Sequence, residues 1–210
     1  MDESELLKSI KNSALDDLVF FSNPSKPLRE RWVVLEFLKI IGLPFDENET
    51  NSLDQSSKTD VLFRDARFQV KEITNPNMLR GKEIKDKYNS IKKAKNIEGI
   101  VLPASSQNLP PAAQMYDLVV KGAKQLSESK TYMASKNDLD LIFYITRQRA
   151  SLVQRKEICS LDFCKLGWRS VSCVNSKQAV VLFAAQDAPD FIKVNSQSGY
   201  NIDSWVNGAP

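Results

Sequence analysis

The stretch DVLFRDARFQVKEI, residues 60–73, is the most informative part of this 210-residue chain. Two runs rich in apolar residues, DVLF and RFQVKEI, flank a turn at residues 64–67. This pattern predicts a β-hairpin over Thr59–Thr74. The hairpin places the residues with the strongest chemical interest next to one another.

Side chains alternate between the two faces of a strand. Gln69 and Lys71 are therefore predicted to share one face of the second strand, and Val70 the other, while Asp60 opens the first strand. Mg²⁺ prefers oxygen ligands, and Asp60, the Gln69 side-chain oxygen and the Val70 carbonyl would supply three. Lys71 would position or deprotonate a water molecule. The alternative is an amphipathic hairpin with a solvated charged face.

Outside the hairpin, the periodicity predicts helices mixed with strands. Helices are expected at Ser4–Phe21, Pro27–Ile41, Arg80–Lys95, Ala112–Ser129 and Arg155–Leu166, with a short helix or turn at Asp187–Ile192. Strands are expected at Leu139–Thr146, Trp168–Val174 and Ala179–Ala184, and loops at Asp46–Lys58 and Ile100–Pro111. This order predicts an α/β or α+β fold with a mixed sheet flanked by helices. Residues 1–194 are expected to form a single domain, and residues 195–210 a polar C-terminal tail.

The composition excludes several chemistries. The chain has no histidine, so Ser-His-Asp catalysis, Cys-His catalysis and His-ligated zinc are excluded. Its three cysteines, Cys159, Cys164 and Cys173, lack the spacing of CxxC pairs, which argues against structural zinc. The acidic, amphipathic N-terminus is not a signal peptide, and no apolar run approaches the ~20 residues of a membrane span. We therefore expect a soluble cytoplasmic protein without membrane association.

Glu30 is the candidate carboxylate on the second predicted helix. It lies one turn before Val33 and Val34, on or beside the apolar face of that helix. Such a carboxylate either points at a site or is a solvated residue favoured by the helix dipole. The sequence leaves both interpretations open.

The segment 80–95 concentrates positive charge. Seven Lys or Arg residues stand against two acidic ones, a net charge of +5, although the whole chain carries only +3. A helical wheel places four of the lysines together, opposite a narrow apolar seam: Lys82, Lys85, Lys92 and Lys93. A clustered basic face is typical of proteins that bind a phosphate backbone. The alternative is a solvated helix face.

Three blocks of the chain, residues 29–45, 60–73 and 167–192, resemble a bacterial family of unknown function whose members are described as endonucleases. The helix Glu, the strand Asp and the Gln-x-Lys also resemble the PD-(D/E)XK nuclease superfamily, which includes type II restriction enzymes. This resemblance implies a restriction-endonuclease-like fold, a central mixed sheet flanked by helices. It also implies Mg²⁺-dependent hydrolysis of DNA phosphodiester bonds, with Mn²⁺ as a substitute.

The resemblance also assigns roles to residues. Glu30 would hold the metal or its water, Asp60 would be the first metal ligand, Gln69 would stand at the second acidic position, and Lys71 would be the catalytic lysine. Thr59 replaces the motif's proline, which matters little. The neutral Gln69 removes a formal charge from the metal site and should weaken Mg²⁺ binding.

Three hypotheses follow. The first is a metal-dependent DNA endonuclease, which would favour a homodimer if it cuts both strands of a duplex. The second is a nuclease-fold protein that binds nucleic acid without cutting it, with Gln69 marking the decayed site. The third is an interaction or regulatory protein without a nucleic-acid role.

Overall fold

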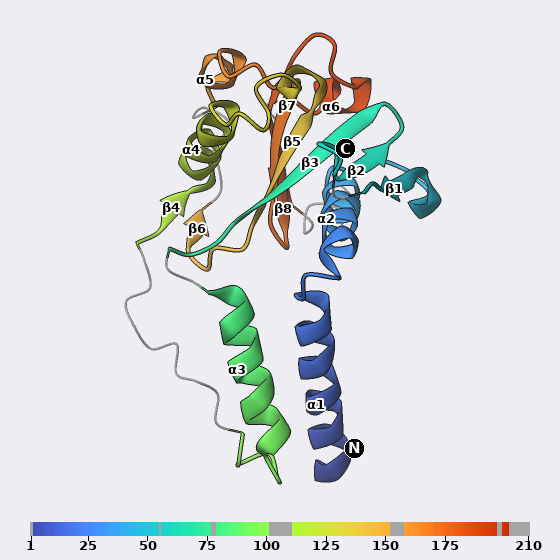
Figure 1. Ribbon diagram of the computed structural model, residues 1–210, viewed down its shortest axis with the longest axis vertical. Helices are drawn as coiled ribbons and strands as arrows, with labels where there is room; N and C mark the ends of the chain where they lie inside the picture. The colour runs from blue at the N-terminus through green and yellow to red at the C-terminus, as the bar shows by residue number, and fades with distance from the viewer. Residues whose placement is uncertain are drawn as a thin grey trace. The chain divides into compact units, whose positions relative to one another are not determined.

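The computed structural model describes residues 2–54, 56–76, 79–100, 111–151, 158–196 and 199–201. Contacts within the chain divide it into two compact units (Figure 1). The helical unit comprises Met1–Arg29 and Pro76–Pro110, and the sheet unit comprises Glu30–Asn75 and Pro111–Pro210. In the described part of the chain, no helix is long and apolar enough to cross a membrane.

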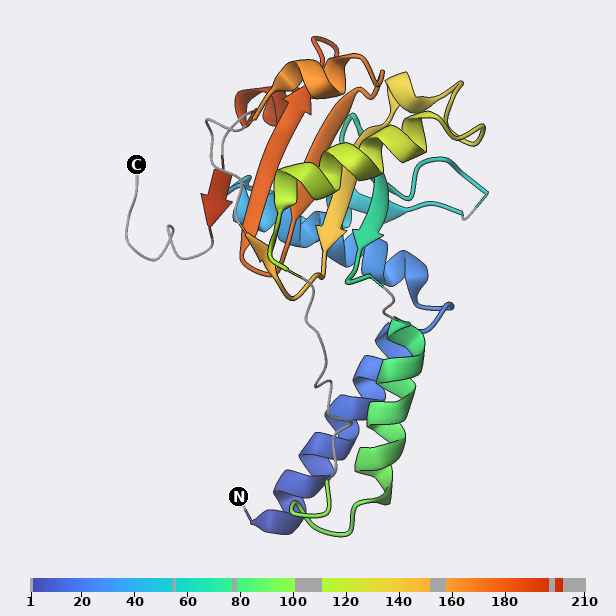
Figure 2. The same ribbon diagram turned by 90° about the vertical axis from the view of Figure 1, so that its left-hand side faces the viewer.

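The helical unit consists of two helices that lie side by side, α1 (Glu3–Phe20) and α3 (Arg80–Lys93) (Figures 1 and 2). A capping box begins α1, in which the Asp2 side chain accepts a hydrogen bond from the Glu5 backbone and the Glu5 side chain accepts one from the Asp2 backbone. Both predicted helices are confirmed to within two residues at each end.

Polar and aromatic contacts join α1 to α3. The Lys11 ammonium donates to the Ala94 carbonyl at 2.7 Å, and Lys87 pairs with Asp17 at 3.2 Å. The Arg80 guanidinium lies 3.7 Å from the centroid of the Phe21 ring. Arg80 and Lys87 are therefore used inside the helical unit.

A mixed seven-stranded sheet forms the centre of the sheet unit, in the order β1-β2-β3-β5-β7-β8-β9. The three central strands, β3, β5 and β7, run parallel, and the remaining pairs are antiparallel. The strands are β1 (Thr50–Ser52), β2 (Val61–Phe63), β3 (Ala66–Ile73), β5 (Asp140–Ile145), β7 (Ser170–Val174), β8 (Gln178–Ala184) and β9 (Gly199–Asn201). A separate pair of short parallel strands is formed by β4 (Ala113–Gln114) and β6 (Ala150–Ser151).

Helices cover both faces of the sheet, as Figure 2 shows for α2 behind it and α4 in front. The helices of this region are α2 (Lys26–Ile40), α4 (Met115–Ser127), α5 (Ser160–Cys164) and α6 (Asp190–Val194), with 3₁₀ turns η1 (Glu47–Glu49) and η2 (Lys136–Asp138). The predicted class, a mixed α/β fold with N-terminal helices and a mixed sheet flanked by helices, is confirmed.

Each face of the sheet has its own core. On the α2 face, Phe68 and Val70 of β3 pack with Phe37, whose ring centroid lies 6.0 Å from that of Phe68. On the α4 face, Phe143 packs in a second cluster. A Cβ atom at Gly122 would lie 2.8 Å from the Phe143 ring, so the close approach of α4 to β5 requires glycine there.

The structure differs from the predicted elements in four places. Residues 50–52, predicted to be loop, form the edge strand β1, and residues 199–201 of the predicted tail form β9. The pair β4–β6 was not predicted. The predicted helix Arg155–Leu166 is shortened to α5 in its described part. Residues 101–110, 152–157 and 202–210 lie outside the described residues.

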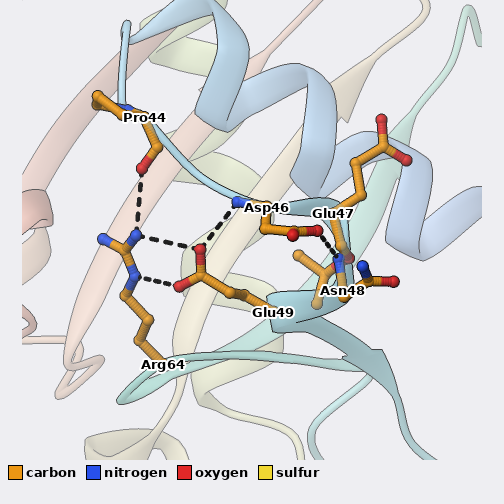
Figure 3. A network of polar contacts seen from close by, with 7 residues as sticks. Pro44, Asp46, Glu47, Asn48, Glu49 and Arg64 are labelled. Carbon is orange, nitrogen blue, oxygen red and sulfur yellow. Dashed lines mark hydrogen bonds and ion pairs between the residues drawn. The ribbon is translucent and has the colours of Figure 1, made fainter.

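The β2–β3 turn is fixed by Arg64, which adopts a positive φ of 52°. Its guanidinium donates to the Glu49 carboxylate, at 2.7 Å from Nε, and to the Pro44 carbonyl at 3.1 Å (Figure 3). Glu49 also accepts a hydrogen bond from the Asp46 backbone at 2.8 Å. These hydrogen bonds, chiefly that from Arg64, lower the pKa of Glu49. The network anchors the hairpin turn to the η1–β1 segment.

A buried carboxylate, Asp140, links the three parallel strands. It accepts hydrogen bonds from the Arg67 backbone of β3 and the Ser170 hydroxyl of β7, both at 2.8 Å. The Arg169 guanidinium forms a two-pronged ion pair with it, at 3.1 Å for Nε. Burial raises the pKa of Asp140, and Arg169 opposes this shift.

Candidate functional site

Asp60 lies immediately before β2 and is almost fully buried. Its backbone continues the hairpin, because the Asp60 N–H donates to the Phe68 carbonyl at 2.8 Å. Its side-chain Oδ2 accepts a hydrogen bond from the Val70 N–H at 2.8 Å and another from the Gln69 amide. The predicted hairpin therefore brings Asp60, Gln69 and Val70 together.

The site lies where β3 extends past the first residue of β2. The register pairs β2 with residues 66–68 of β3. The N–H and C=O of one strand residue point to the same side, so the Val70 carbonyl points toward the side from which Asp60 approaches. The Gln69 amide nitrogen is 3.5 Å from this carbonyl oxygen. A carboxylate, an amide and a carbonyl thus meet at one edge of β3.

Lys71 lies on the same face of β3 as Gln69, because residues 68 and 70 pack on the opposite, α2 face. This confirms the alternation predicted from the sequence. The Lys71 ammonium lies 5.5 Å from the centroid of the Tyr132 ring. An ammonium over an aromatic face is stabilised by about 0.5–2 kcal/mol, depending on its exposure.

Tyr132 was missed by the sequence analysis. It is 8% exposed, lies in the connection between α4 and β5, and its ring centroid is 5.7 Å from that of Trp168. That connection has no periodic pattern and is distant from Lys71 in sequence. Only the parallel pairing of β3 with β5 brings the two residues together, and no local signal predicts it.

Glu30 is buried, with 8% of its surface exposed. It precedes Phe37 by two helical turns and therefore shares the face that packs on the sheet. Helix α2 runs antiparallel to β3. Its Phe37 packs on Phe68, near the start of β3. Its earlier residue Trp32 packs on Tyr144 of β5, which pairs with Glu72 near the end of β3. Glu30 therefore lies on the α2 face of the sheet, whereas Gln69 and Lys71 are on the opposite face of β3. Its burial argues against the solvated-carboxylate interpretation.

The donor set suits a hard cation. In the described ranges, no three acidic or cysteine side chains gather as a metal site. The candidate ligands are instead the Asp60 carboxylate, the Gln69 amide oxygen and the Val70 carbonyl, all of them oxygens, which Mg²⁺ prefers. The Gln69 amide presents its nitrogen to Asp60, so a half-turn of the amide is needed before its oxygen can serve as a ligand.

The four candidate nucleic-acid-binding residues, Lys82, Lys85, Lys92 and Lys93, lie on α3 and are all exposed. The opposite face of α3 faces α1 and contains Ile91, which is buried, and Ile84 and Tyr88, which are half-buried. The helical wheel drawn from the sequence therefore predicted correctly that these lysines are exposed and that the apolar side of α3 is packed.

These elements define a mixed α/β protein with a candidate oxygen-ligand site at the edge of β3. The chain belongs to the family described as "Putative endonuclease, protein of unknown function (DUF1780)", whose model matches residues 2–207.

No curated protein matches the chain. A similar solved structure is described as a protein of unknown function, PA4535, from Pseudomonas aeruginosa strain PAO1, monooxygenase superfamily. The two sequences are 21% identical, the match covers 96% of each chain, and the TM-score is 0.62. At this identity the likeness shows a shared fold.

Proposed function

We propose that the protein is a Mg²⁺-dependent endonuclease that hydrolyses DNA phosphodiester bonds at the edge of β3, in a site of the PD-(D/E)XK kind. The observation that carries this proposal is the convergence of Asp60, Gln69 and Val70, with Lys71 next to Gln69 on the same strand face. Membership of a family described as endonucleases supports it. Mn²⁺ would substitute for Mg²⁺.

The functional group of each residue indicates the role that it would have. Asp60, the Gln69 oxygen and the Val70 carbonyl would hold the cation, which when bound supplies positive charge against the reacting phosphate. Lys71, a compact cation with three donors, would bind a phosphate oxygen or orient the attacking water. Glu30 lies on the opposite, α2 face of the sheet, so its role would be to hold the metal or its water from that side rather than the water that Lys71 orients.

Two conservative variants test this site. Asp60→Asn keeps an oxygen that can accept the hydrogen bond from the Val70 N–H. Lys71→Met keeps a side chain of similar length without its charge. Each is expected to reduce Mg²⁺-dependent cleavage of plasmid DNA at least about 100-fold. Asp187→Asn and Lys177→Met, at exposed positions of the same unit, serve as matched controls with wild-type cleavage. Full activity in both Asp60→Asn and Lys71→Met would show that the site is wrong.

The basic face of α3 would bind the phosphate backbone of the DNA. Four lysine contacts to a duplex predict that log K falls against log salt with a slope of about −3.6. Lys85→Glu and Lys92→Glu should each weaken binding and flatten this slope by at least about 0.9, as measured by fluorescence anisotropy. Lys177→Glu makes the same change in charge outside the helical unit and should retain the wild-type slope. Equal slopes in all four proteins would exclude this face from the interface.

A second candidate function is binding of nucleic acid without cleavage, and the Gln69 amide favours it. Its nitrogen satisfies Asp60 without any cation, and a neutral residue at this position weakens the metal site. This candidate predicts salt-sensitive DNA binding with no hydrolysis in Mg²⁺ or Mn²⁺. Appearance of cleavage in Gln69→Glu would identify a disabled nuclease, whereas cleavage by the wild type rejects this candidate.

The monooxygenase label belongs to the similar solved structure, and at 21% identity it is not carried over to this chain. The similarity supports the arrangement of sheet and helices on which the proposed site is built.

A further inference from the structure

We propose that Tyr132 is a positioning residue for Lys71, and that its ring holds the Lys71 ammonium in place for the phosphate. This inference rests on the proposed nuclease function. It adds a residue that lies outside the Asp60, Gln69, Lys71 and Glu30 set, in the connection between α4 and β5.

The geometry places a flexible cation against a rigid ring. Lys71 is only partly buried, and its side chain has four rotatable bonds, so the ammonium alone would sample many positions. The ammonium lies 5.5 Å from the Tyr132 ring centroid, within the range of a cation–π contact. The ring therefore favours one set of positions of the ammonium, on the side of β3 that also presents Gln69.

The Tyr132 ring is itself firmly held. The Tyr132 backbone N–H donates to the Ser129 carbonyl at 3.0 Å, and the Tyr132 carbonyl accepts from Ser135 and Lys136, both at 2.9 Å. The ring packs against Trp168, whose indole N–H donates to the Ala123 carbonyl at 3.1 Å. Because the ring has little freedom to move, it restricts the positions that the Lys71 ammonium can adopt.

A purely structural role for Tyr132 makes different predictions from a positioning role. If the ring only fills space in the α4 core, its loss should lower stability and leave the Lys71 ammonium where it was. If the ring positions Lys71, its loss should change the surroundings of the Lys71 Cε protons and the turnover rate, whereas phenylalanine should preserve both.

The first test observes the contact without relying on activity. In protein labelled with ¹³C-lysine, the Lys71 ε-methylene protons, assigned by their disappearance in Lys71→Met, should be shifted upfield by the Tyr132 ring. The shift should persist in Tyr132→Phe and vanish in Tyr132→Leu. Tyr88→Leu is the matched control, because Lys92 lies 5.6 Å from the Tyr88 centroid, and it should move the Lys92 signal alone. Lys71 protons at the ordinary lysine position in the wild type would overturn the proposal.

The second test measures the rate of DNA cleavage. Tyr132→Leu should lower kcat about threefold to thirtyfold with KM little changed, and Tyr132→Phe should restore it. Thermal unfolding of each variant, followed by circular dichroism, sets an assay temperature at which all are folded. Wild-type kcat in folded Tyr132→Leu would overturn the positioning role. A wild-type chain that does not cleave at all would overturn the proposed function, while the NMR shift would still decide whether Tyr132 fixes the ammonium.

Discussion

Gln69 stands at the position to which the resemblance to PD-(D/E)XK nucleases assigns a second carboxylate, and its amide can act in two ways. In one orientation its nitrogen donates to Asp60, as the structure shows. In the other its oxygen joins that of Asp60, which is favourable only when a cation lies between them. An amide therefore keeps the site stable without metal, whereas two adjacent buried carboxylates would repel each other.

This difference predicts the behaviour of Gln69→Glu. Without divalent metal the variant should be less stable than the wild type by about 1–3 kcal/mol, because a buried hydrogen-bond donor is replaced by a second negative charge. Mg²⁺ should then raise the unfolding temperature of the variant more than that of the wild type. Thermal unfolding with EDTA and with Mg²⁺ measures both effects.

The substitution Gln186→Glu provides the control for Gln69→Glu, since it adds the same charge at an exposed position. It should change stability by less than about 0.5 kcal/mol under both conditions. If Gln69→Glu responds to Mg²⁺ no more than this control, the edge of β3 does not bind the metal.

The residues of the candidate site were predictable to different degrees. The sequence alone placed Asp60 beside Gln69, because a hairpin pairs residues close in sequence. It also placed Glu30 on or beside the apolar face of its helix, but it could not decide whether the side chain was buried. Tyr132 was beyond reach, because its contact with Lys71 depends on the parallel pairing of distant strands.

At the scale of elements, the Asp140–Arg169 pair joins β5 and β7 within the sheet. Asp140 is fully buried and the Arg169 side chain is 13% exposed. Arg169→Met would leave a buried carboxylate without its cation, so at neutral pH we expect the free energy of unfolding to fall by about 3–5 kcal/mol. Urea denaturation at several pH values measures this loss.

The decrease in the free energy of unfolding caused by Arg169→Met should become smaller as the pH is lowered. Burial already raises the pKa of Asp140 above its ordinary value of 3.8, and removing Arg169 raises it further. The folded variant then holds a proton more tightly than the unfolded chain, so its stability increases as the pH falls through the raised pKa toward 3.8. Lys193→Met, which breaks an exposed ion pair with Asp190, is the control and should cost under about 1 kcal/mol. A pH-independent deficit in Arg169→Met would contradict the prediction.

Elements with a strong local pattern were predicted from the sequence, and those that depend on partners were not. The helical period located α1, α2, α3 and α4 because each has an apolar stripe. The polar triplet Thr50–Ser52 has no such pattern, and it becomes β1 only because β2 offers an edge with which it pairs. The strands β4 and β6 likewise form only because two segments distant in sequence pair with each other.

At the scale of the whole molecule, the three cysteines report on the integrity of the sheet. Cys159 and Cys164 are exposed, whereas Cys173 lies buried on β7, and burial raises its pKa to about 12. Ellman's reagent at pH 8 should therefore label two thiols rapidly in the folded protein and a third only on unfolding. Cys173→Ala should abolish the slow phase. Rapid labelling of all three thiols in the folded protein would contradict the burial of β7.

The predicted fold class was correct because the order of helices and strands restricts the architectures available to a chain. The division into a helical unit and a sheet unit was not predicted. Its cause is that α1 and α3 pack against each other although residues 30–75 lie between them in the sequence, a long-range contact that no short stretch of sequence predicts.

The parallel pairing of β3 with β5 also sets the time at which the protein acquires its candidate site. Residue 69 pairs with residue 141, and β5 in turn needs β7 beyond it. A ribosome that has released the hairpin has not yet made the strands that support it, and contacts this distant in sequence form slowly. Asp60 and Lys71 therefore leave the ribosome early, but the strands that hold β3 in place are complete only about a hundred residues later, once β7 has been made.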